Sequence, residues 1–386
     1  MPQNQLQNFI FDHIANTPQQ RITFAEYMDL VLYQPEYGYY SAGKVKIGSQ
    51  GDFFTSVSLG SDFGELLAKQ FAEMWELLDC PRPFTLLEMG AGQGLLANDI
   101  LHYLHLNYQE LWENLQYIIV EQAPAFISEQ KKLLQPWQEK GLNISWHFWS
   151  EIPESSLIGC CFSNELVDAF PVHRVTVKEG KLQEIYVTVS GDKLVEVADD
   201  ISTDKLTEYF QLIDTKFPSP AYPKGYVTEV NLAALDWLEK VAKRLQKGYL
   251  LTIDYGYPAQ RYYSPQRREG TLKCYYQHRH HNNPYINLGS QDLTCHIDFT
   301  ALEIQGEKCG LPKVDFTKQA LFLMALGLGD RLANLTNTKL DLNTMLKRRN
   351  ALQQLIDPTG LGNFGVLLQA TADCQDFDLT GFPDIP

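Results

Sequence analysis

Short apolar runs alternate with longer amphipathic segments along most of the chain. Each run has the length of a buried strand, and the segments between several of them carry apolar residues at helical spacing. A repeated strand–helix order predicts an α/β fold in which a mostly parallel sheet has helices on both faces. The runs expected to form its seven strands are residues 84–88, 116–120, 144–148, 159–163, 249–254, 312–318 and 364–370.

The N-terminal region has a different pattern. Residues 1–41 have apolar positions at helical spacing, and residues 62–78 form a strongly amphipathic segment. Between them, residues 43–60 are polar and punctuated by glycine, which favours a loop over the ligand site. We therefore expect a helical extension with this loop in residues 1–82, followed by the sheet-forming domain in residues 83–386.

Two insertions interrupt the strand–helix order. Residues 173–197 alternate like strands around two glycine turns and predict a β-meander, within an insertion of about residues 172–225. Residues 256–299 form a second insertion that is rich in Tyr, Arg and His. After it, the chain predicts one long apolar helix over residues 319–328.

Composition indicates a soluble enzyme rather than a nucleic-acid-binding or membrane protein. The 386 residues carry a formal net charge of −15, whereas phosphate binding needs a basic face. No apolar run approaches the ~20 residues of a membrane span, and the first residues lack the features of a signal or transit peptide. The seven cysteines form no C-x-x-C pair, which fits a reducing compartment. We expect a cytoplasmic protein without membrane insertion.

The most informative motif follows the first expected strand. Glu88 ends the run, and Gly90, Gly92 and Gly94 follow at alternate positions before a helix-forming segment. Glycine lets the backbone turn tightly and approach a ligand, as in nucleotide-binding sheets. This spacing favours S-adenosylmethionine, and Glu88 suits the ammonium end of that cofactor. Counted from Gly92, the spacing G-x-G-x-x-A also fits a dinucleotide, so both a dinucleotide and a purely structural turn stay open.

Polar residues also follow two further strands. Glu121 comes directly after the second strand and can accept both ribose hydroxyls of a nucleoside cofactor. Asn164, Glu165 and Asp168 follow the fourth strand, where Asn164 can meet the amino-acid end of the cofactor. The two carboxylates suit a cationic acceptor such as a guanidinium, because they would orient it and disperse the positive charge of methyl transfer to nitrogen. Alternatively, they begin the next helix, where acids favour the helix dipole.

A histidine forms a further candidate. His296 and Asp298 would point the same way in an extended segment, and His296 could take or relay a proton. A solvated loop histidine explains the position equally well. Residues 277–281, Gln-His-Arg-His-His, have no carboxylate or thiolate set at ligand spacing, so we expect a polar loop and no metal site.

Five motifs, taken in order, make the chain resemble the MidA family. They are YQPEYGYY at residues 33–40, GDFFTS at 51–56, EMGAGQG at 88–94, NELVDAFPV at 164–172 and DLTCHIDF at 292–299. The resemblance spans nearly the whole chain and implies a class I, Rossmann-like methyltransferase that uses S-adenosylmethionine. The mitochondrial members of this family are respiratory complex I assembly factors that methylate an arginine of a complex I subunit.

The resemblance, together with the motifs themselves, yields a set of candidate site residues. The expected cofactor-binding residues are Thr55, Ser56, Glu88, Gly90, Ala91, Gly92, Gly94, Glu121 and Asn164. The catalytic candidates are Glu165, Asp168 and His296. Ala91 replaces a proline and Phe170 a leucine of many relatives, and both changes are conservative. Because the chain lacks a mitochondrial presequence, it resembles the bacterial branch, whose acceptor the mitochondrial case does not decide.

Two other functions stay open. One is a dinucleotide-dependent oxidoreductase, and the other is a non-catalytic assembly factor that binds a partner through the acidic surface or through residues 256–299. For the favoured function we expect a protein substrate, with arginine as the acceptor and no nucleic acid. A homodimer is possible.

Overall fold

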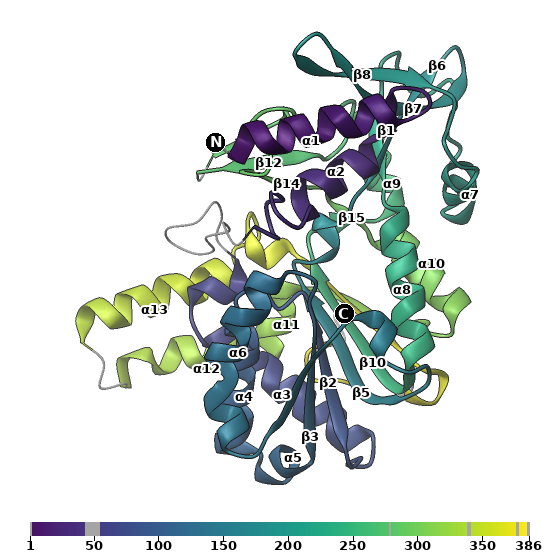
Figure 1. Ribbon diagram of the computed structural model, residues 1–386. Coiled ribbons are helices and arrows are strands. Elements are labelled where there is room, and N and C mark those ends of the chain that lie inside the picture. Colours follow the sequence, from purple (N-terminus) through teal and green to yellow (C-terminus); the bar gives the residue numbers. More distant parts are fainter. Residues whose placement is uncertain (1, 43–54, 278, 338–340, 376–377, 384–386) are drawn as a thin grey trace.

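The computed structural model describes residues 2–42, 55–277, 279–337, 341–375 and 378–383 (Figure 1). A seven-stranded sheet forms its centre, with the strand order β16-β17-β10-β5-β2-β3-β4. The pairs among β4, β3, β2, β5 and β10 are parallel, and β17 runs antiparallel to both of its neighbours. The bounds are β2 (Phe84–Met89), β3 (Leu115–Val120), β4 (Asn143–His147), β5 (Leu157–Asn164), β10 (Leu245–Asp254), β16 (Lys313–Lys318) and β17 (Gly365–Ala370). The expected mostly parallel, Rossmann-like sheet is confirmed.

The strand order places a ligand site. From β2 the chain adds β3 and β4 on one side, and then returns to place β5 on the other side of β2. All six residues of β2 are buried, because the strand lies in the middle of the sheet. The order reverses between β2 and β5, and open α/β sheets bind ligands at the carboxyl ends of strands at such a point.

Helices cover both faces of the sheet and bury two apolar cores. One core contains residues of α3 to α6 and α11 to α13, and the other contains residues of α8 and α10. The bounds are α3 (Asp62–Leu77), α4 (Leu95–Asn107), α5 (Gln109–Asn114), α6 (Pro124–Glu139), α8 (Leu232–Arg244), α10 (Phe299–Cys309), α11 (Gln319–Ala325), α12 (Leu328–Ala333) and α13 (Leu342–Leu355). The single helix expected over residues 319–328 is wrong, since Gly327 has φ +101° and separates α11 from α12.

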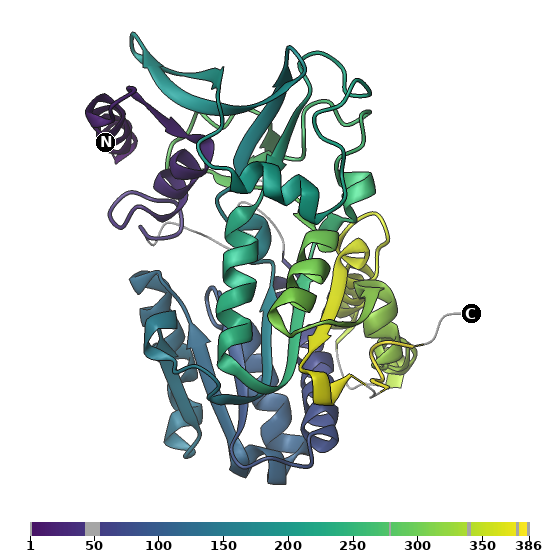
Figure 2. The same ribbon diagram turned by 90° about the vertical axis from the view of Figure 1, so that its right-hand side faces the viewer.

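A second layer lies beyond one end of the sheet, as both ribbon views show (Figures 1 and 2). It contains an antiparallel sheet in which β1 pairs with β7 of the predicted meander and β9 pairs with β6. The bounds are α1 (Pro2–Asn16), β1 (Arg21–Thr23), α2 (Phe24–Tyr33), β6 (His173–Lys178), β7 (Lys181–Ser190), β8 (Lys193–Asp199), α7 (Lys205–Leu212) and β9 (Val227–Val230). The first two helices therefore share a core with the insertions, whereas α3 packs on the main sheet. The domain boundary at residue 82 stays a prediction.

The second insertion forms short elements that are anchored to this layer. They are β11 (Gly256–Tyr257), α9 (Ala259–Tyr262), β12 (Lys273–Tyr276), β13 (Arg279–His281), β14 (Asp292–Thr294) and β15 (Ile297–Asp298). The buried Glu229 of β9 accepts the Thr271 N–H at 2.8 Å and the Leu272 N–H at 3.4 Å. A Cβ at Gly270 would lie 2.1 Å from Glu229 Oε1, so glycine allows this close approach.

Short 3₁₀ turns complete the described chain. They are η1 (Ser56–Leu59), η2 (Trp149–Glu151), η3 (Val167–Ala169), η4 (Asn334–Asn337), η5 (Leu361–Asn363) and η6 (Ala372–Cys374). Of the loop predicted over residues 43–60, residues 43–54 lie outside the described residues. Its last part is η1, which leads into α3.

Candidate functional site

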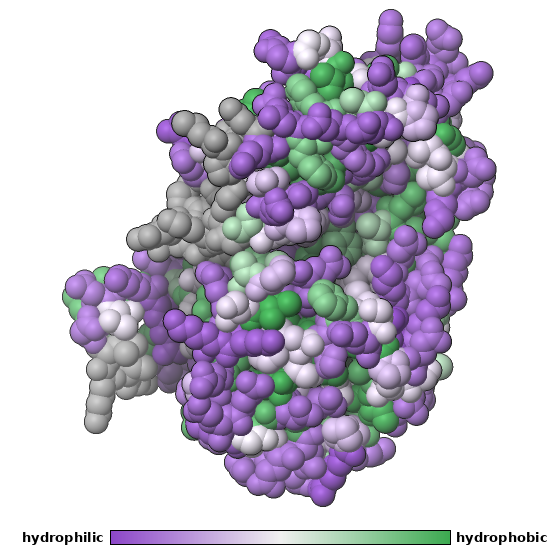
Figure 3. All heavy atoms as spheres, viewed as in Figure 1, coloured by the Kyte–Doolittle hydropathy of each residue, from purple (hydrophilic) through white to green (hydrophobic). Residues whose placement is uncertain are grey.

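A cavity of about 770 Å³ lies at the carboxyl ends of β2, β3 and β5. It is bounded on the side of the second layer by α2 and the segment after it. The surface of the molecule is hollowed between the two layers (Figure 3). The predicted site residues that line the cavity are Thr55, Glu88, Gly90, Ala91, Gly92, Glu121, Asn164 and Glu165. Ser56, Gly94, Asp168 and His296 do not line it.

The turn after β2 requires glycine. Gly90, Gly92 and Gly94 have φ values of +70°, +53° and +81°, in the left-handed region. A Cβ on Gly90 would lie 2.6 Å from Leu166 Cδ1, so the turn packs directly against the segment after β5. Gly94 begins α4 without a side-chain hydrogen bond to the first turn of that helix. The first N–H groups of α4 therefore have no side-chain cap, and such a helix start favours an anionic or polar ligand.

Glu88 is buried at the end of β2, beside the cavity. Tyr117 of β3 donates a hydrogen bond of 2.7 Å to Glu88 Oε2. Burial raises the pKa of Glu88 to about 7, although the hydrogen bond from Tyr117 lowers it in part. A cationic ligand at this position would favour the ionised carboxylate.

Glu121 is fixed at the end of β3. The two backbone N–H groups that follow it donate to Oε1 at 2.8 and 2.9 Å. Gln130 of α6 donates to Glu121 Oε2 at 3.3 Å and to the Gly92 carbonyl at 2.7 Å, and it accepts from Trp146 Nε1 at 2.9 Å. This fully buried glutamine joins the glycine turn to β3 and β4. Sequence reasoning missed Gln130, because nothing in its position along α6 marks it.

Glu165 has an unusual backbone conformation, and both of its hydrogen-bond donors bind the same carboxylate oxygen. Its φ is +51°, in the left-handed region that a non-glycine residue rarely adopts and that is enriched at functional sites. Glu165 Oε1 accepts from the Ser56 N–H at 3.2 Å and from Asn164 Nδ2 at 3.3 Å. Within the described part of the chain, Oε2 has no hydrogen bond, and the Asn164 Oδ1 atom is buried without a partner. Two acceptor atoms are thus available for a donor-rich ligand.

Glu165, which is half-buried at the cavity, belongs to a group of three carboxyls with the buried Asp168 and Asp254. Burial and then Asp168 raise the pKa of Glu165 to about 8. Burial also raises the pKa of Asp168, and burial with Asp168 and Glu165 raises that of Asp254 well above its usual range. Asp254 Oδ2 accepts the N–H groups of Val167 and Asp168 at 3.0 and 3.2 Å, whereas Asp168 Oδ1 is buried without a partner. Among the described residues, no Lys, Arg or His forms an ion pair with any of the three.

Two tyrosines of the N-terminal segment complete the acidic side of the cavity. The hydroxyl of Tyr33 donates to the Ala169 carbonyl at 2.9 Å, and that of Tyr40 donates to Asp292 Oδ1 at 2.8 Å. The two rings stack with centroids 5.5 Å apart. Both line the cavity, which the sequence signalled only as part of a family motif.

The opposite wall of the cavity is aromatic. Phe148 and Trp149 follow β4, and Trp237 of α8 donates to Met89 Sδ at 3.2 Å. Sequence reasoning missed all three, although Phe148 ends an expected strand and Trp149 directly follows it, where site residues of such a sheet gather. Flat apolar side chains at this edge suit the base of a nucleoside.

His296 lies outside the cavity. Its ring stacks on Tyr257 with centroids 4.8 Å apart and meets the edge of Tyr255 at 5.0 Å. Burial, with Arg267, Lys273 and Arg261 nearby, lowers the pKa of His296 to about 4. The structure therefore does not bring this histidine to the acceptor side, and the neutral ring does not act there as a cation. The neighbouring Asp298 caps α10, accepting the Thr300 N–H at 3.0 Å.

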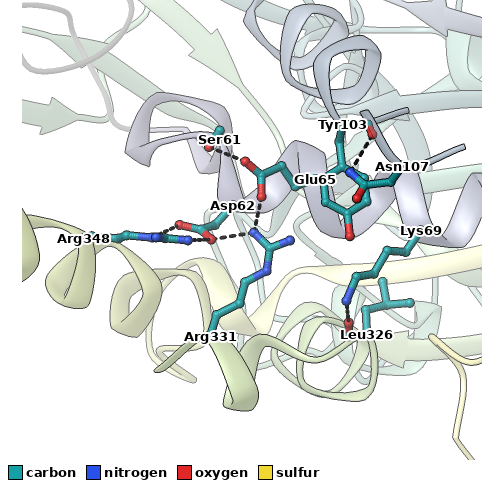
Figure 4. A network of polar contacts seen from close by, with 9 residues as sticks. All are labelled: Ser61, Asp62, Glu65, Lys69, Tyr103, Asn107, Leu326, Arg331 and Arg348. Carbon is teal, nitrogen blue, oxygen red and sulfur yellow. Dashed lines mark hydrogen bonds and ion pairs between the residues drawn. The ribbon is translucent and has the colours of Figure 1, made fainter. Parts of the chain in front are cut away.

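An ion-pair network joins α3 to α12 and α13 (Figure 4). Asp62 of α3 binds Arg331 of α12 at 2.6 Å and Arg348 of α13 at 2.7 Å, and Glu65 binds Arg331 at 2.5 Å. Lys69 donates to the Leu326 carbonyl at 3.1 Å. Because α3 follows η1 directly, this network fixes the described end of the loop that reaches Glu165.

Comparison with known proteins identifies the family. A family model described as "putative S-adenosyl-L-methionine-dependent methyltransferase" matches residues 66–317. The chain belongs to this family. A solved structure from Burkholderia thailandensis, bound to S-adenosyl-homocysteine, is similar to this chain, with a TM-score of 0.85 and 30% sequence identity. The match covers 98% of this chain and 95% of that one. The chain is therefore an S-adenosylmethionine-dependent methyltransferase, and the oxidoreductase alternative finds no support.

Curated relatives extend the comparison. The Drosophila melanogaster "Protein arginine methyltransferase NDUFAF7 homolog, mitochondrial" is 29% identical, over 88% of this chain and 79% of the relative. The human protein arginine methyltransferase NDUFAF7, mitochondrial, is 27% identical over 90% and 80%. These relatives contradict the expected cytoplasmic location, because both are named as mitochondrial proteins.

Two further findings concern only the described residues. No group of three or more His, Cys, Asp or Glu among them is placed to hold a metal ion. None of their helices has both the length and the apolar character that a bilayer crossing demands.

Proposed function

We propose that this methyltransferase modifies a guanidinium nitrogen of an arginine in a protein substrate. The observation that carries the proposal is the group of Glu165, which lines the cavity, and the buried Asp168 and Asp254, because this group has no cationic partner in the described chain. Desolvated carboxyls without a cation are costly, so a site that keeps three of them together is suited to a cation that arrives as ligand. The names of the curated relatives, which are protein arginine methyltransferases, point to the same acceptor.

The cofactor would be held by residues on the β2–β3 side of the cavity. We assign the turn around Gly90, Ala91, Gly92 and Gly94 to its amino-acid part, together with Glu88 and Asn164 Oδ1. Glu121 Oε2 would accept the ribose hydroxyls, and the Thr55–Ser56 segment would close the site from the loop side. When bound, the sulfonium supplies an already activated methyl group, so the protein contributes mainly alignment and electrostatics.

Glu165 is the residue that we assign to the acceptor. Because both protein donors bind Oε1, Oε2 is left to accept a hydrogen bond from the guanidinium and to fix the orientation of its reacting nitrogen. In the transfer, the N–C bond would form as the S–CH3 bond breaks, with S-adenosyl-homocysteine as the leaving group. The positive charge that the sulfonium loses would pass to the guanidinium, where the carboxylates of Glu165 and Asp168 would stabilise it until the methylated nitrogen releases its proton. Since Asp168 does not line the cavity, it would act through its charge beside Glu165.

The protein partner follows from the resemblance to the mitochondrial members. We propose a subunit of an NADH dehydrogenase-type complex as the acceptor protein, and hence a role in the assembly of that complex. A homodimer stays a prediction.

The test is labelling of a lysate from a strain that lacks this protein, with S-adenosylmethionine carrying a tritiated methyl group. We expect the purified protein to label a lysate protein, and hydrolysis of that protein to release methylarginine. Release of methyllysine or another methylated residue instead would refute the arginine proposal.

Gly92→Val is the matched control. The branched side chain would enter the ligand space at a residue with φ +53°, and the expected result is loss of cofactor binding by calorimetry, at least ~100-fold, with the fold retained. If this variant binds the cofactor tightly, the placement of the site is wrong. If the variant loses cofactor binding and still restores complex assembly in the deletion strain, the protein works there as a non-catalytic assembly factor.

A further inference from the structure

The second insertion carries a group of cations that the methyl-transfer site does not use. Arg261 lies on α9 and Arg267 follows it, with guanidinium carbons 4.2 and 4.5 Å from the ring centroid of Tyr257. His296 stacks on the same ring. Lys273 begins β12 and Lys318 ends β16. We call the two arginines and two lysines the basic cluster.

The positive charge of this cluster is not compensated within the described chain. Within those residues, none of its four members forms an ion pair with a carboxylate. The charges that lower the pKa of His296 are those of Arg267, Lys273 and Arg261. The charge that lowers the pKa of Lys318 is that of Arg261. A chain with a net charge of −15 thus places two arginines on one tyrosine ring, with two lysines nearby, and among the described residues none of the four has a carboxylate partner.

Two buried atoms at the same place also lack partners. Arg267 Nε and His296 Nδ1 are buried without a hydrogen bond in the structure. Stacking on Tyr257 accounts for the position of the arginine planes, but it leaves this N–H group unsatisfied. An anion between the guanidinium groups would satisfy both the charge and the free donor.

The basic cluster is connected to the acceptor side by a single aromatic residue. The Tyr255 ring lies 5.0 Å from His296, and its hydroxyl acts on Asp168, lowering the pKa of that carboxyl. The Tyr255 ring lies 5.0 Å from the His296 ring, and the His296 ring lies 4.8 Å from the Tyr257 ring. The Arg261 guanidinium lies 4.2 Å from the Tyr257 ring, which completes the connection to the cluster. These steps limit the separation between the Tyr255 ring and the Arg261 guanidinium to on the order of 15 Å, a distance that about four to five residues of extended chain can span.

We propose that the basic cluster binds acidic side chains of the protein substrate, about four to five residues away from the arginine that enters the cavity. The inference rests on the proposed arginine acceptor. The acidic site would bind the arginine of a substrate segment, and the basic cluster would bind acidic residues of the same segment. These contacts would align the substrate and select it, and they would not contribute to the chemical step.

The kinetic test uses two peptides with one central arginine. The first has glutamates at the fourth and fifth positions on both sides, and the second has glutamines there. We expect kcat/KM for the glutamate peptide to be about tenfold higher, through KM. In the double variant Arg261→Ala/Arg267→Ala, the advantage disappears while kcat and the glutamine peptide are unaffected. No preference in the wild type, or an equal loss for both peptides in the variant, overturns the proposal.

Control variants separate recognition from folding. Lys347→Ala/Arg349→Ala removes the same charge from α13 and should leave the preference unchanged. If the double variant melts early because the Tyr257 stack is lost, the exposed Arg261 is replaced alone and should lower the preference about threefold. Loss of the preference in the α13 control would show a general charge effect and would contradict a specific cluster.

A binding experiment keeps the proposal testable without catalysis. The glutamate peptide, with norleucine in place of arginine, is titrated by fluorescence anisotropy into protein saturated with S-adenosyl-homocysteine. Binding that weakens with salt and is lost in Arg261→Ala/Arg267→Ala supports the cluster, even if no arginine peptide is methylated and the proposed acceptor fails. Equal binding by wild type and variant overturns it, as does tighter binding of a single-stranded oligonucleotide of the same charge.

Discussion

Two groups of carboxylates, one in α3 after η1 and one that Ser56 of η1 contacts, differ in their partners. In α3, burial alone would raise the pKa of Asp62, but hydrogen bonds from Arg348 and Arg331 outweigh it and lower the pKa (Figure 4). At and beside the cavity, the pKa values of Glu165, Asp168 and Asp254 are all raised by burial, and no cation of the described chain offsets this.

The difference separates a structural from a functional use of the same side chain. A paired carboxylate fixes one helix to another, as Asp62 fixes α3 to α12 and α13. An unpaired one lowers the stability of the free protein, and it is retained where a ligand supplies the missing charge. Neutralising a carboxylate should therefore have opposite effects in the two groups.

The largest effect is expected for Glu165→Gln. The amide keeps the shape but loses the charge that orients and stabilises the guanidinium, so kcat should fall about 100-fold while the affinity for S-adenosylmethionine is retained. At pH 8.5 the variant should unfold at the same or a higher temperature than the wild type, because an unpaired buried charge is removed. Stopped-time methylation assays and thermal melts measure both. Wild-type turnover would show that the carboxylate has no role in transfer.

Asp62→Asn should show the reverse. The change leaves Arg348 without its carboxylate partner and Arg331 with Glu65 alone. The free energy of unfolding should fall by about 2 kcal/mol, less than for a fully buried pair because Arg348 is partly exposed. Activity at a temperature where the variant is folded should stay within about threefold of wild type. Chemical denaturation gives the stability. A loss of activity as large as that of Glu165→Gln, without a loss of stability, would remove the distinction between the two groups.

The pH dependence of kcat/KM sharpens the comparison further. Glu165 has a pKa of about 8 in the free protein, so the fraction of ionised carboxylate rises between pH 6.5 and 8. We expect kcat/KM for an arginine peptide to rise about tenfold over this range, and the rise to be absent in Glu165→Gln. Since the folded pKa lies above the usual 4.5, this group also stabilises the free protein at low pH and loses that contribution as the pH rises to 8. A flat wild-type profile would contradict the raised pKa.

The sheet and the glycine turn were predictable because they depend on local pattern. The seven strands appear as apolar runs, and the turn at residues 90–94 requires positive φ, which selects glycine. Glu121 and Glu165 could be found because both directly follow strands, and the carboxyl ends of parallel strands meet at one edge.

The remaining site residues depend on contacts between distant segments. Tyr33 and Tyr40 reach the cavity because β1 joins the sheet of the first insertion and carries α2 with it, which no local spacing indicates. Gln130 is one polar residue on an amphipathic helix until the fold places it against the Gly92 carbonyl. For His296, the local argument found a polar residue at a suitable position, but in the fold its ring stacks on Tyr257 and does not line the cavity.

The smallest effect on activity is expected for a change of Gln319, which contacts both the segment beside Glu165 and helix α13. Gln319 of α11 is fully buried, accepts a hydrogen bond from Ser56 Oγ at 3.3 Å and donates to the Leu355 carbonyl of α13 at 3.0 Å. Ser56 in turn donates its N–H to Glu165 Oε1 at 3.2 Å, and this bond lowers the pKa of Glu165 against the effect of burial.

Gln319→Leu should therefore act through Ser56 on the acceptor carboxylate. We expect kcat to fall only a few-fold, roughly threefold to fivefold, with unchanged cofactor affinity. The midpoint of the kcat/KM profile should move to higher pH, because Glu165 loses part of the hydrogen bond that favours its ionised form. A purely structural role would lower stability and leave this midpoint in place, so an unmoved midpoint in a folded variant would show that α11 and α13 support the fold without positioning Glu165.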